Sequence, residues 1–225
     1  EIHRLSLSDQ AYDYIKRLIL SGEIRGGERI PEEKVAQRFG VSRTPIREAI
    51  SRLEEYGLVQ IKPRAYAEVV ALEPHEAGQL AVIRAQLETL AVSLLTDCGT
   101  EEDFRELDLL AKECNDAVAE GDIATTFERD SQLHLETARR TGNRHLYEIC
   151  EKLDAKIQLL RLVLRIPRGK LIGYVKHHDG IIAAMRSRDK ELAIALMKHH
   201  VMNQLNDQEM VESAEAGCLT AGMKS

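Results

Sequence analysis

Six successive stretches between residues 75 and 213 repeat apolar side chains every three or four positions, and no other feature constrains the fold as strongly. Short breaks separate them, each combining a helix-stop signal with a residue able to cap the next helix: DCGTEED, EGD, TGN, IPRG and SRD. The expected helices cover residues 75–97, 101–119, 122–140, 143–165, 168–187 and 189–213. The sequence therefore predicts an all-helical bundle over 73–213, followed by a flexible tail at 214–225.

The first 72 residues follow a different plan. Helical spacing over 8–20 gives way to the glycine-rich stretch SGEIRGGERI, and a short helix is expected over 31–38. A third helix follows, with Ser42 as its N-cap, and Gly57 stops it. The β-branched stretch LVQIKPRAYAEVVAL, interrupted by a proline, is typical of a two-stranded hairpin. The sequence thus predicts a mostly α protein, with three helices and a β-hairpin in 1–72 before the bundle.

Composition narrows the class of protein. Tryptophan is absent and aromatic residues are sparse, which suits packed helices better than a sandwich of strands. No run of about 18 apolar residues occurs, and no basic-plus-apolar leader stands at the start of the sequence, so we expect no membrane span and no secretion signal. The four cysteines lie far apart without a C-x-x-C pair, as expected for reduced thiols of a cytoplasmic protein.

The net charge of −6 argues against a general polyanion binder. The charge is unevenly distributed, because the first 72 residues are nearly balanced and the remainder carries the negative excess. Phosphates would be repelled by the acidic remainder. Any contact with nucleic acid is therefore expected in the first 72 residues.

The third expected helix carries two faces. One is an apolar stripe at spacings of four and three residues, formed by Ile46, Ile50 and Leu53. The neighbouring face points away from it and carries Arg43, Thr44, Arg47 and Ser51. A short helix, a tight turn and a second helix with an exposed first turn form a helix-turn-helix, whose second helix enters the major groove. Arginine matches guanine's two acceptors, while threonine and serine reach phosphates. Spacing alone leaves open a merely solvated helical face.

The stretch RIPEEKVAQRFGVSRTPIREAISRLEEYGLV resembles the winged helix-turn-helix of GntR-family transcription regulators, and GVSRTPIREAI matches the family's most diagnostic run nearly residue for residue. The similarity spans about residues 8–72. It implies that operator DNA is contacted by Arg38, Ser42, Arg43, Thr44 and Arg47, with Arg38 at the DNA backbone. Two positions depart from the family pattern. Where this sequence has Glu33, some members carry a DNA-contacting arginine. The wing tip PRAYAEV lacks the usual glycine, which makes Arg64 a weaker candidate for DNA contact than Arg47.

Helical phase directs four ligating side chains into the bundle. Asp130 and His134 lie one turn apart on the inward stripe of helix 122–140. In each of two double histidines, the second member, His178 or His200, falls on the apolar face of its helix. A divalent metal ion would satisfy all four buried groups at once. The alternative is a set of separate core histidines bonded to carbonyl groups, which remains the simpler interpretation of any single histidine.

Residues 75–210 resemble the all-helical FCD domain of FadR-type GntR regulators. The family pattern selects the same four residues, Asp130, His134, His178 and His200. In order along the chain, it consists of D-x-x-x-H, TGNRHL, H-x-x-I-x-x-A-x(4)-D and M-x-x-H. The resemblance implies a divalent metal ion, commonly zinc or nickel, in a pocket that receives a small carboxylate effector. Nitrogen and oxygen ligands do not select one metal by themselves.

Arg84 lies on the inward stripe of helix 75–97. By the same resemblance its guanidinium group would bind the effector carboxylate, since arginine holds carboxylates in a bidentate manner. An ion pair between Arg84 and Glu88, four residues along the helix, is an equally acceptable interpretation.

The main prediction is a transcription regulator, not an enzyme, whose affinity for operator DNA is controlled by an effector bound at a metal site. A homodimer is expected, because a two-fold protein reads the two half-sites of a palindromic operator. Whether the protein represses or activates is not decided by the sequence.

Two other classes of protein stay open. One is a metal-dependent enzyme, with Glu88 as the only inward acid or base beyond the ligands. The other is an adaptor that no longer binds DNA, which Glu33 and the unusual wing would favour.

Overall fold

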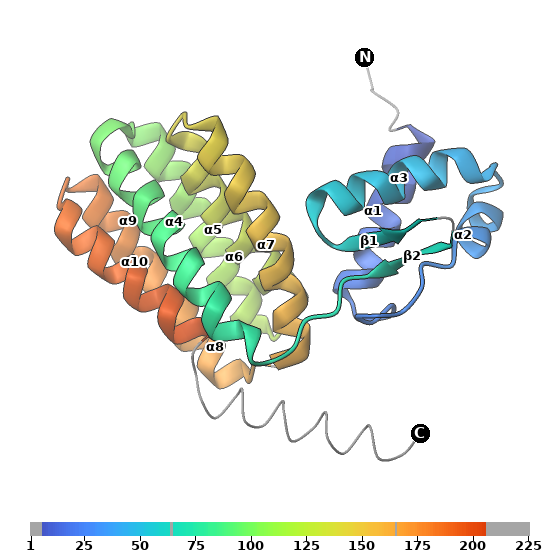
Figure 1. Cartoon of the computed structure of the whole chain (residues 1–225). Helices are drawn as coiled ribbons and strands as arrows, with labels where there is room; N and C mark the ends of the chain where they lie inside the picture. Colours follow the sequence, from blue (N-terminus) through green and yellow to red (C-terminus); the bar gives the residue numbers. More distant parts are fainter. Residues whose placement is uncertain (1–5, 64, 165, 206–225) are drawn as a thin grey trace. The chain divides into compact units, whose positions relative to one another are not determined.

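The computed structural model describes residues 6–63, 65–164 and 166–205. These residues divide into two compact units. The first comprises the described residues up to Leu72 together with Ala155–Leu162, and the second comprises Glu73–Asp154 and the described residues from Val163 onward (Figure 1). Arg64, the end of the last expected helix at 206–213 and the expected tail at 214–225 lie outside the described residues.

The first unit contains the expected three helices and hairpin. The helices are α1 (Leu7–Leu20), α2 (Glu32–Phe39) and α3 (Arg43–Tyr56), and the strands are β1 (Val59–Lys62) and β2 (Tyr66–Val69). The strands pair antiparallel, with Val59 opposite Val69 and Lys62 opposite Tyr66. Gly40 ends α2 and Gly57 ends α3, both with positive φ, which glycine adopts without steric cost.

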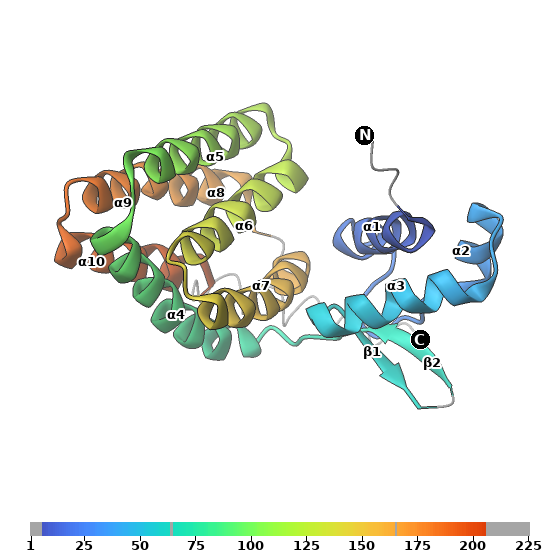
Figure 2. The same cartoon turned by 90° about the horizontal axis from the view of Figure 1, so that it is seen from above.

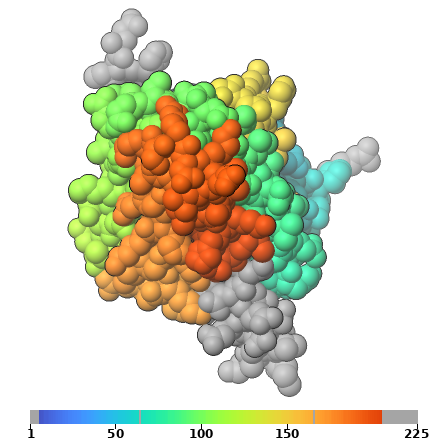
Figure 3. Space-filling model, turned by 90° about the vertical axis from the view of Figure 1, so that its left-hand side faces the viewer, coloured from blue at the N-terminus to red at the C-terminus, as the bar shows by residue number. Residues whose placement is uncertain are grey.

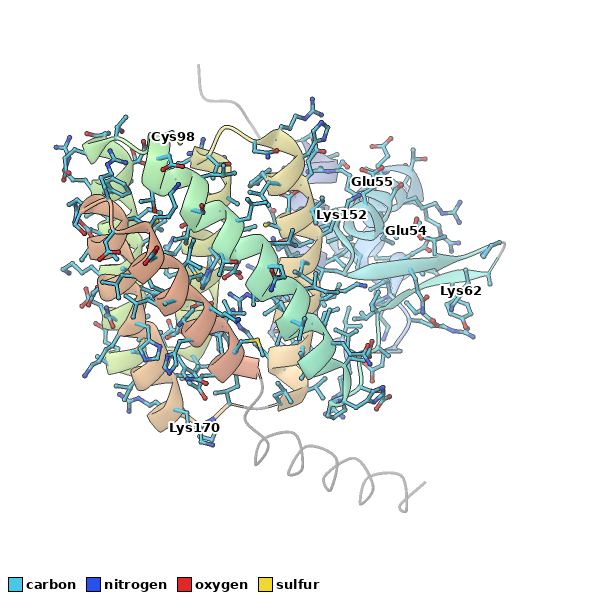
Figure 4. The ribbon with its side chains drawn as sticks, turned by 60° about the vertical axis from the view of Figure 1, so that its left-hand side comes forward. Glu54, Glu55, Lys62, Cys98, Lys152 and Lys170 are labelled. Atoms are coloured by element: carbon cyan, nitrogen blue, oxygen red, sulfur yellow. The ribbon has the colours of Figure 1, made fainter. Side chains whose placement is uncertain are left out.

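The core of the first unit fixes the orientation of α3. Ile46, Ile50 and Leu53 are buried, as the stripe predicts. Glu54, near the end of the same helix, accepts a hydrogen bond from the backbone N–H of Ile61 at 2.7 Å (Figure 4). Because packing holds one side of α3 and the hairpin holds its end, the first turn is left facing solvent.

The second unit is an all-helical bundle (Figure 2). Its helices are α4 (Glu76–Cys98), α5 (Glu101–Glu120), α6 (Ile123–Arg140), α7 (Arg144–Leu164), α8 (Arg168–Val175), α9 (His177–Arg186) and α10 (Lys190–Leu205). Of α7, the segment Ala155–Leu162 is grouped with the first unit. Thr100 caps α5 and Asp122 caps α6 through their side chains, so these two breaks act as the sequence predicts.

One predicted helix is wrong. The stretch expected as a single helix over 168–187 is divided at Lys176 into α8 and α9. The backbone N–H of Lys176 bonds to the carbonyl of Tyr174, so the regular ladder to the fourth preceding residue is interrupted there. Gly173 and Gly180 flank the junction, and glycine weakens a helix interior by about 0.5–1 kcal/mol relative to alanine. The apolar spacing continues through this point, which hides the break from a periodicity argument.

The bundle core is aliphatic and joins most of the helices. Helix α10 packs along α4 and α9, and α5 packs along α6, α8 and α9. Cys98 and Lys170 mark opposite ends of the bundle (Figure 4). No helix among the described residues has the length and apolar character needed to cross a membrane.

Candidate DNA-reading helix and buried metal-ligating cluster

The first turn of α3 presents the predicted DNA-contacting residues to solvent. Ser42, Arg43, Thr44 and Arg47 are all exposed, and the side chains of Arg43 and Arg47 are 55 % and 67 % accessible. Ser42 occupies the N-cap position, but its hydroxyl makes no capping hydrogen bond. That hydroxyl and the first backbone N–H groups of α3 therefore face outward together, an arrangement that favours anions.

Two acidic residues of α2 contact the arginines of α3. Arg43 lies 3.4 Å from Glu33, and Arg47 lies 3.2 Å from Glu32. Exposed ion pairs of this kind are worth only about 0–1 kcal/mol, so they hold the guanidinium groups without preventing their transfer to another anion. Glu33, the departure from the family pattern, thus has a structural role as the partner of Arg43.

Arg38, predicted at the DNA backbone, is exposed near the end of α2. Its guanidinium carbon lies 4.7 Å from the ring centroid of Tyr14, a cation–π contact that orients the side chain. Arg64, predicted at the wing tip, lies outside the described residues.

The four predicted ligands meet inside the bundle. Asp130 and His134 come from α6, His178 from α9 and His200 from α10. One ligating atom from each lies within 4.8 Å of the others, and no more than 5 % of any of the four residues is exposed. Three helices thus bring together exactly the set that helical phase selects.

Three of the separations between these atoms are close to those of ligands around one ion. Nε2 of His134 lies 3.1 Å from Nε2 of His200, and Oδ1 of Asp130 lies 3.2 Å from Nε2 of His178 and 3.7 Å from Nε2 of His134. Ligands held at about 2.0–2.2 Å in tetrahedral geometry are themselves about 3.3–3.6 Å apart, within a few tenths of an ångström of these three separations. The donor set of three imidazoles and one carboxylate therefore fits a divalent transition metal.

The alternative of separate core histidines predicts hydrogen bonds to backbone carbonyls. Within the described part of the chain, Nδ1 of His178 and Nδ1 of His200 are buried and have no hydrogen-bond partner. Nε2 of His178 is close to Asp130 but out of line for a hydrogen bond. Uncompensated burial of polar nitrogens is unfavourable. An ion would give Nε2 of His178 a partner and would account for the convergence of the Nε2 atoms, whereas carbonyl bonding does not.

Glu88 and Arg84 of α4 border the cluster. Oε2 of Glu88 lies 2.8 Å from Nδ1 of His134, at an angle poor for a hydrogen bond but close enough for an ion pair. Nε of Arg84 donates to Glu88 at 2.6 Å, and another of its nitrogens donates to Gln204. The predicted pair between Arg84 and Glu88 is therefore present. Nη2 of Arg84 lies 4.0 Å from Oδ2 of Asp130, so the guanidinium group also faces the ligands.

Burial and charge set the protonation of this centre. Burial raises the pKa of Glu88, but the charges of Arg84 and His134 outweigh it and lower that pKa to about 2. Burial lowers the pKa of His200 well below its usual value and also lowers the pKa of His178. Burial acts in the same direction on His134, but the Glu88 carboxylate overcomes it and raises that pKa. His178 and His200 are thereby kept neutral, the state in which imidazole binds metals.

Sequence reasoning did not assign two neighbours of the site. The sequence predicts Glu88 as a partner of Arg84 or as a possible acid or base, but it does not predict the contact of Glu88 with His134. Gln204 follows His200 by four residues and so shares its helix face, a signal that was available. Its hydrogen bond to Arg84 joins α10 to α4 beside the ligands.

A solvent-facing helix on a three-helix winged unit, carried in one chain with an all-helical bundle, defines a two-part DNA-binding transcription regulator. Residues 7–69 match the bacterial regulatory proteins of the gntR family, and residues 79–203 match the FCD domain. The chain therefore belongs to the GntR family, in the FadR-type branch that carries an FCD domain. The family and fold class predicted from the sequence are confirmed.

Known relatives are similar to this chain over most of their length. The HTH-type transcriptional regulator YdhC of Bacillus subtilis is 31 % identical over 198 residues, covering 88 % of this chain and 87 % of that protein. The HTH-type transcriptional repressor RspR of Escherichia coli is 25 % identical over 207 residues, covering 92 % and 88 %. The solved structure of E. coli McbR/YncC has a TM-score of 0.78 at 24 % identity, covering 93 % of this chain and 99 % of that one, and supports the fold.

Proposed function

We propose that this regulator binds a palindromic operator as a homodimer, and that a small carboxylate effector bound at a metal ion in the helical bundle controls its affinity for DNA. In this proposal residues 1–72 form the DNA-binding domain and residues 73–213 form the effector-binding and dimerisation domain. The observation that carries it is the convergence of Asp130, His134, His178 and His200 within 4.8 Å in a buried site.

The proposed ion is zinc or nickel, because three imidazoles and one carboxylate suit borderline divalent metals. When bound, the ion would supply positive charge and, by expanding beyond four ligands, a coordination position for an oxygen of the effector. Arg84 is assigned the rest of the carboxylate, since its Nη2 faces the cluster at 4.0 Å from Asp130, beyond hydrogen-bonding distance. Glu88 and Gln204 hold the other nitrogens of Arg84 and so orient the guanidinium group.

At the DNA, we assign Arg43 and Arg47 to base edges in the major groove, where arginine pairs with guanine. Ser42 and Thr44 are assigned to phosphates, Arg38 to the DNA backbone and Arg64 to the wing contact. For Ser42, Arg43, Thr44 and Arg47, the exposed first turn of α3 supports these assignments. We place the protein in the cytoplasm, where it would meet operator DNA. The similarity to RspR, a transcriptional repressor, supports repression as the regulatory outcome.

Effector and operator binding must be thermodynamically coupled in this scheme. If the effector weakens operator binding, then the operator weakens effector binding by the same factor. This reciprocity separates an effector from a metabolite that merely co-purifies.

The enzyme alternative requires an available acid or base. Glu88 is engaged by Arg84 and His134, which favours a structural role for its carboxylate. Turnover of an ester, amide or sugar acid that a chelator abolishes would restore the enzyme hypothesis. The adaptor alternative loses one support, because Glu33 contacts Arg43 without covering α3.

The test combines elemental analysis with fluorescence anisotropy. Purified full-length chain should contain about one zinc or nickel ion per chain and should bind DNA from the promoter nearest its own gene. Mass spectrometry of material released from the pocket should identify a carboxylate that changes the operator affinity. Operator affinity that is unaffected both by chelation and by every released carboxylate would contradict the proposed control.

A further inference from the structure

The enclosed position of the cluster raises the question of how an ion reaches it. Asp130, His178 and His200 are at most 1 % exposed, and His134 is 5 % exposed. A buried metal site requires an entry path as well as ligands. The most direct candidates are polar side chains on the helices that already supply ligands.

A second histidine pair lies beside the buried one. His177 on α9 and His199 on α10 directly precede the ligands His178 and His200, and consecutive helical residues point about 100° apart. His199 is exposed and His177 is half-buried. Figure 3 shows the face of the bundle on which α9 and α10, in orange and red, reach the surface.

The rings of this outer pair are spaced like the rings of the buried ligands. The centroids of His177 and His199 are 5.3 Å apart, whereas the three buried rings are separated by 4.7, 5.1 and 5.4 Å. Two imidazoles that share a tetrahedral ion at about 2.1 Å have centroids about 5 Å apart. The outer pair therefore has the spacing needed to hold a cation between two rings.

Contacts of the outer rings connect them to the buried site. The ring of His177 lies edge-on to that of His200, with centroids 5.8 Å apart. Nδ1 of His177 is buried and has no hydrogen-bond partner among the described residues. The ring of His199 is held on the surface of α10 by Asn203, whose Nδ2 lies 2.8 Å from Nε2. The series from His199 through His177 to His200 thus leads from solvent to a ligand.

We propose that His177 and His199 form an outer two-histidine site that captures a divalent cation of the zinc or nickel class and passes it to the buried cluster beside His200. The inference rests on the proposed metal site. Transfer exchanges one nitrogen ligand for another, with no change in the oxidation state of the ion. Two protein ligands bind more weakly than four, so the outer site holds the ion only in transit.

A surface hollow of about 470 Å³ offers a competing entrance. It is lined by Asn115, Val118, Ala119, Ile172, Lys176 and Asp179. Its lining carries one positive and one negative side chain, Lys176 and Asp179, and none of its lining residues is a ligand of the buried site. Asp179 on this hollow provides a variant that tests the competing route.

The experiment measures the rate and the extent of metal uptake separately. Full-length protein is stripped with a chelator and mixed with Co²⁺ in a stopped-flow instrument, with the cobalt absorption bands as the signal. We expect His177→Ala and His199→Ala to load at least about tenfold more slowly than the unmodified chain, which is ~1.4 kcal/mol on the barrier. Final metal content and melting temperature should be unchanged, because the four buried ligands remain.

Controls and outcomes separate this inference from the proposed function. His145→Ala removes a histidine of α7 whose side chain is 89 % accessible, and it should load at the unmodified rate. Failure of the unmodified chain to bind any ion would remove the metal site itself. Unmodified loading rates in both His177→Ala and His199→Ala would overturn only the entry route. The entry route would also be overturned if Asp179→Asn were the only variant that loads slowly. It would be overturned as well if His177→Ala or His199→Ala lost as much final metal content as His178→Ala.

Discussion

At the residue scale, the two sites depend on opposite environments for charged and ligating groups. The guanidinium groups of Arg43 and Arg47 remain in water with weakly held acidic partners. The imidazoles of His134, His178 and His200 are buried, so burial and neighbouring charges control their protonation. Substitutions at the two sites should therefore have separable effects on DNA affinity and on metal content.

Arg47→Ala should weaken operator binding by about 1–3 kcal/mol, or roughly 5- to 150-fold, because a bidentate contact with guanine is lost. Circular dichroism and metal content should be unchanged, since the side chain is 67 % accessible. Arg52→Ala is a matched control on the same helix, because Arg52 is also exposed but pairs with Asp9 at 2.7 Å. Equal operator affinities for Arg47→Ala and the unmodified protein, measured by anisotropy at fixed salt, would exclude the proposed docking.

His178→Ala should lower both metal content and melting temperature. A ligand that binds only the native state stabilises it by about 4 kcal/mol when present at 1,000 times its dissociation constant. Because any large-to-small core change also destabilises, the diagnostic is the response to a chelator. Chelation should lower the melting temperature of the unmodified protein but leave that of His178→Ala unchanged. Full metal occupancy in the variant would refute the assigned ligand set.

At the element scale, short backbone features decide where the functional helices point. Gly40, with φ of 64°, turns the chain between α2 and α3 and so sets the direction of α3. In the bundle, the break at Lys176 places α9 separately from α8 and brings His178 beside Asp130 of α6. Both features are local in sequence, yet each determines which partners a helix meets.

Gly40→Ala should destabilise the protein by about 1–2 kcal/mol, because a side chain disfavours the left-handed backbone. It should also weaken operator binding, because relief of the strain tilts α3. Gly22→Ala is a matched control, since Gly22 has φ of 75° and, like Gly40, has open space around an added Cβ. Chemical denaturation should show similar losses of stability in both variants. A similar loss of operator affinity in both would contradict the role assigned to the turn.

At the scale of the whole molecule, the proposed function requires two copies. Helix α4 buries one side against α10 and exposes Val82, Ile83 and Leu90 on the other, at 53 %, 53 % and 46 %. Exposed aliphatic residues gathered on one helix are typical of an interaction surface. We assign this face of α4 to the contact between protomers, which a two-fold reader of a palindrome needs.

Ile83→Glu combined with Leu90→Glu should convert a dimer to a monomer in sedimentation velocity experiments, because two carboxylates from each protomer would be buried at the contact. Operator affinity should fall with dimerisation, since each protomer would then read only one half-site. Leu109→Glu on α5 is the control, because Leu109 is 60 % exposed on a different helix. A double variant that remains dimeric would rule out this face as the interface.

Side-chain direction could be predicted from the sequence because it is a local property. A period of 3.6 residues fixes which positions share a helix face, so Asp130, His134, His178 and His200 could be selected as inward before any helix was placed. The same rule separated buried Ile46, Ile50 and Leu53 from exposed Arg43 and Arg47, and the glycine and capping residues defined most helix ends.

Distances between helices depend on tertiary packing, and these distances decided which side chains contact one another. The contact of Glu88 with His134, the bond from Arg84 to Gln204 and the ion pair between Arg43 and Glu33 each join residues on different helices. Periodicity also failed at Lys176, because the apolar spacing continues while the hydrogen-bond ladder breaks. By itself the sequence determined which side chains face inward and which face solvent, whereas only the packed helices determined which of them touch.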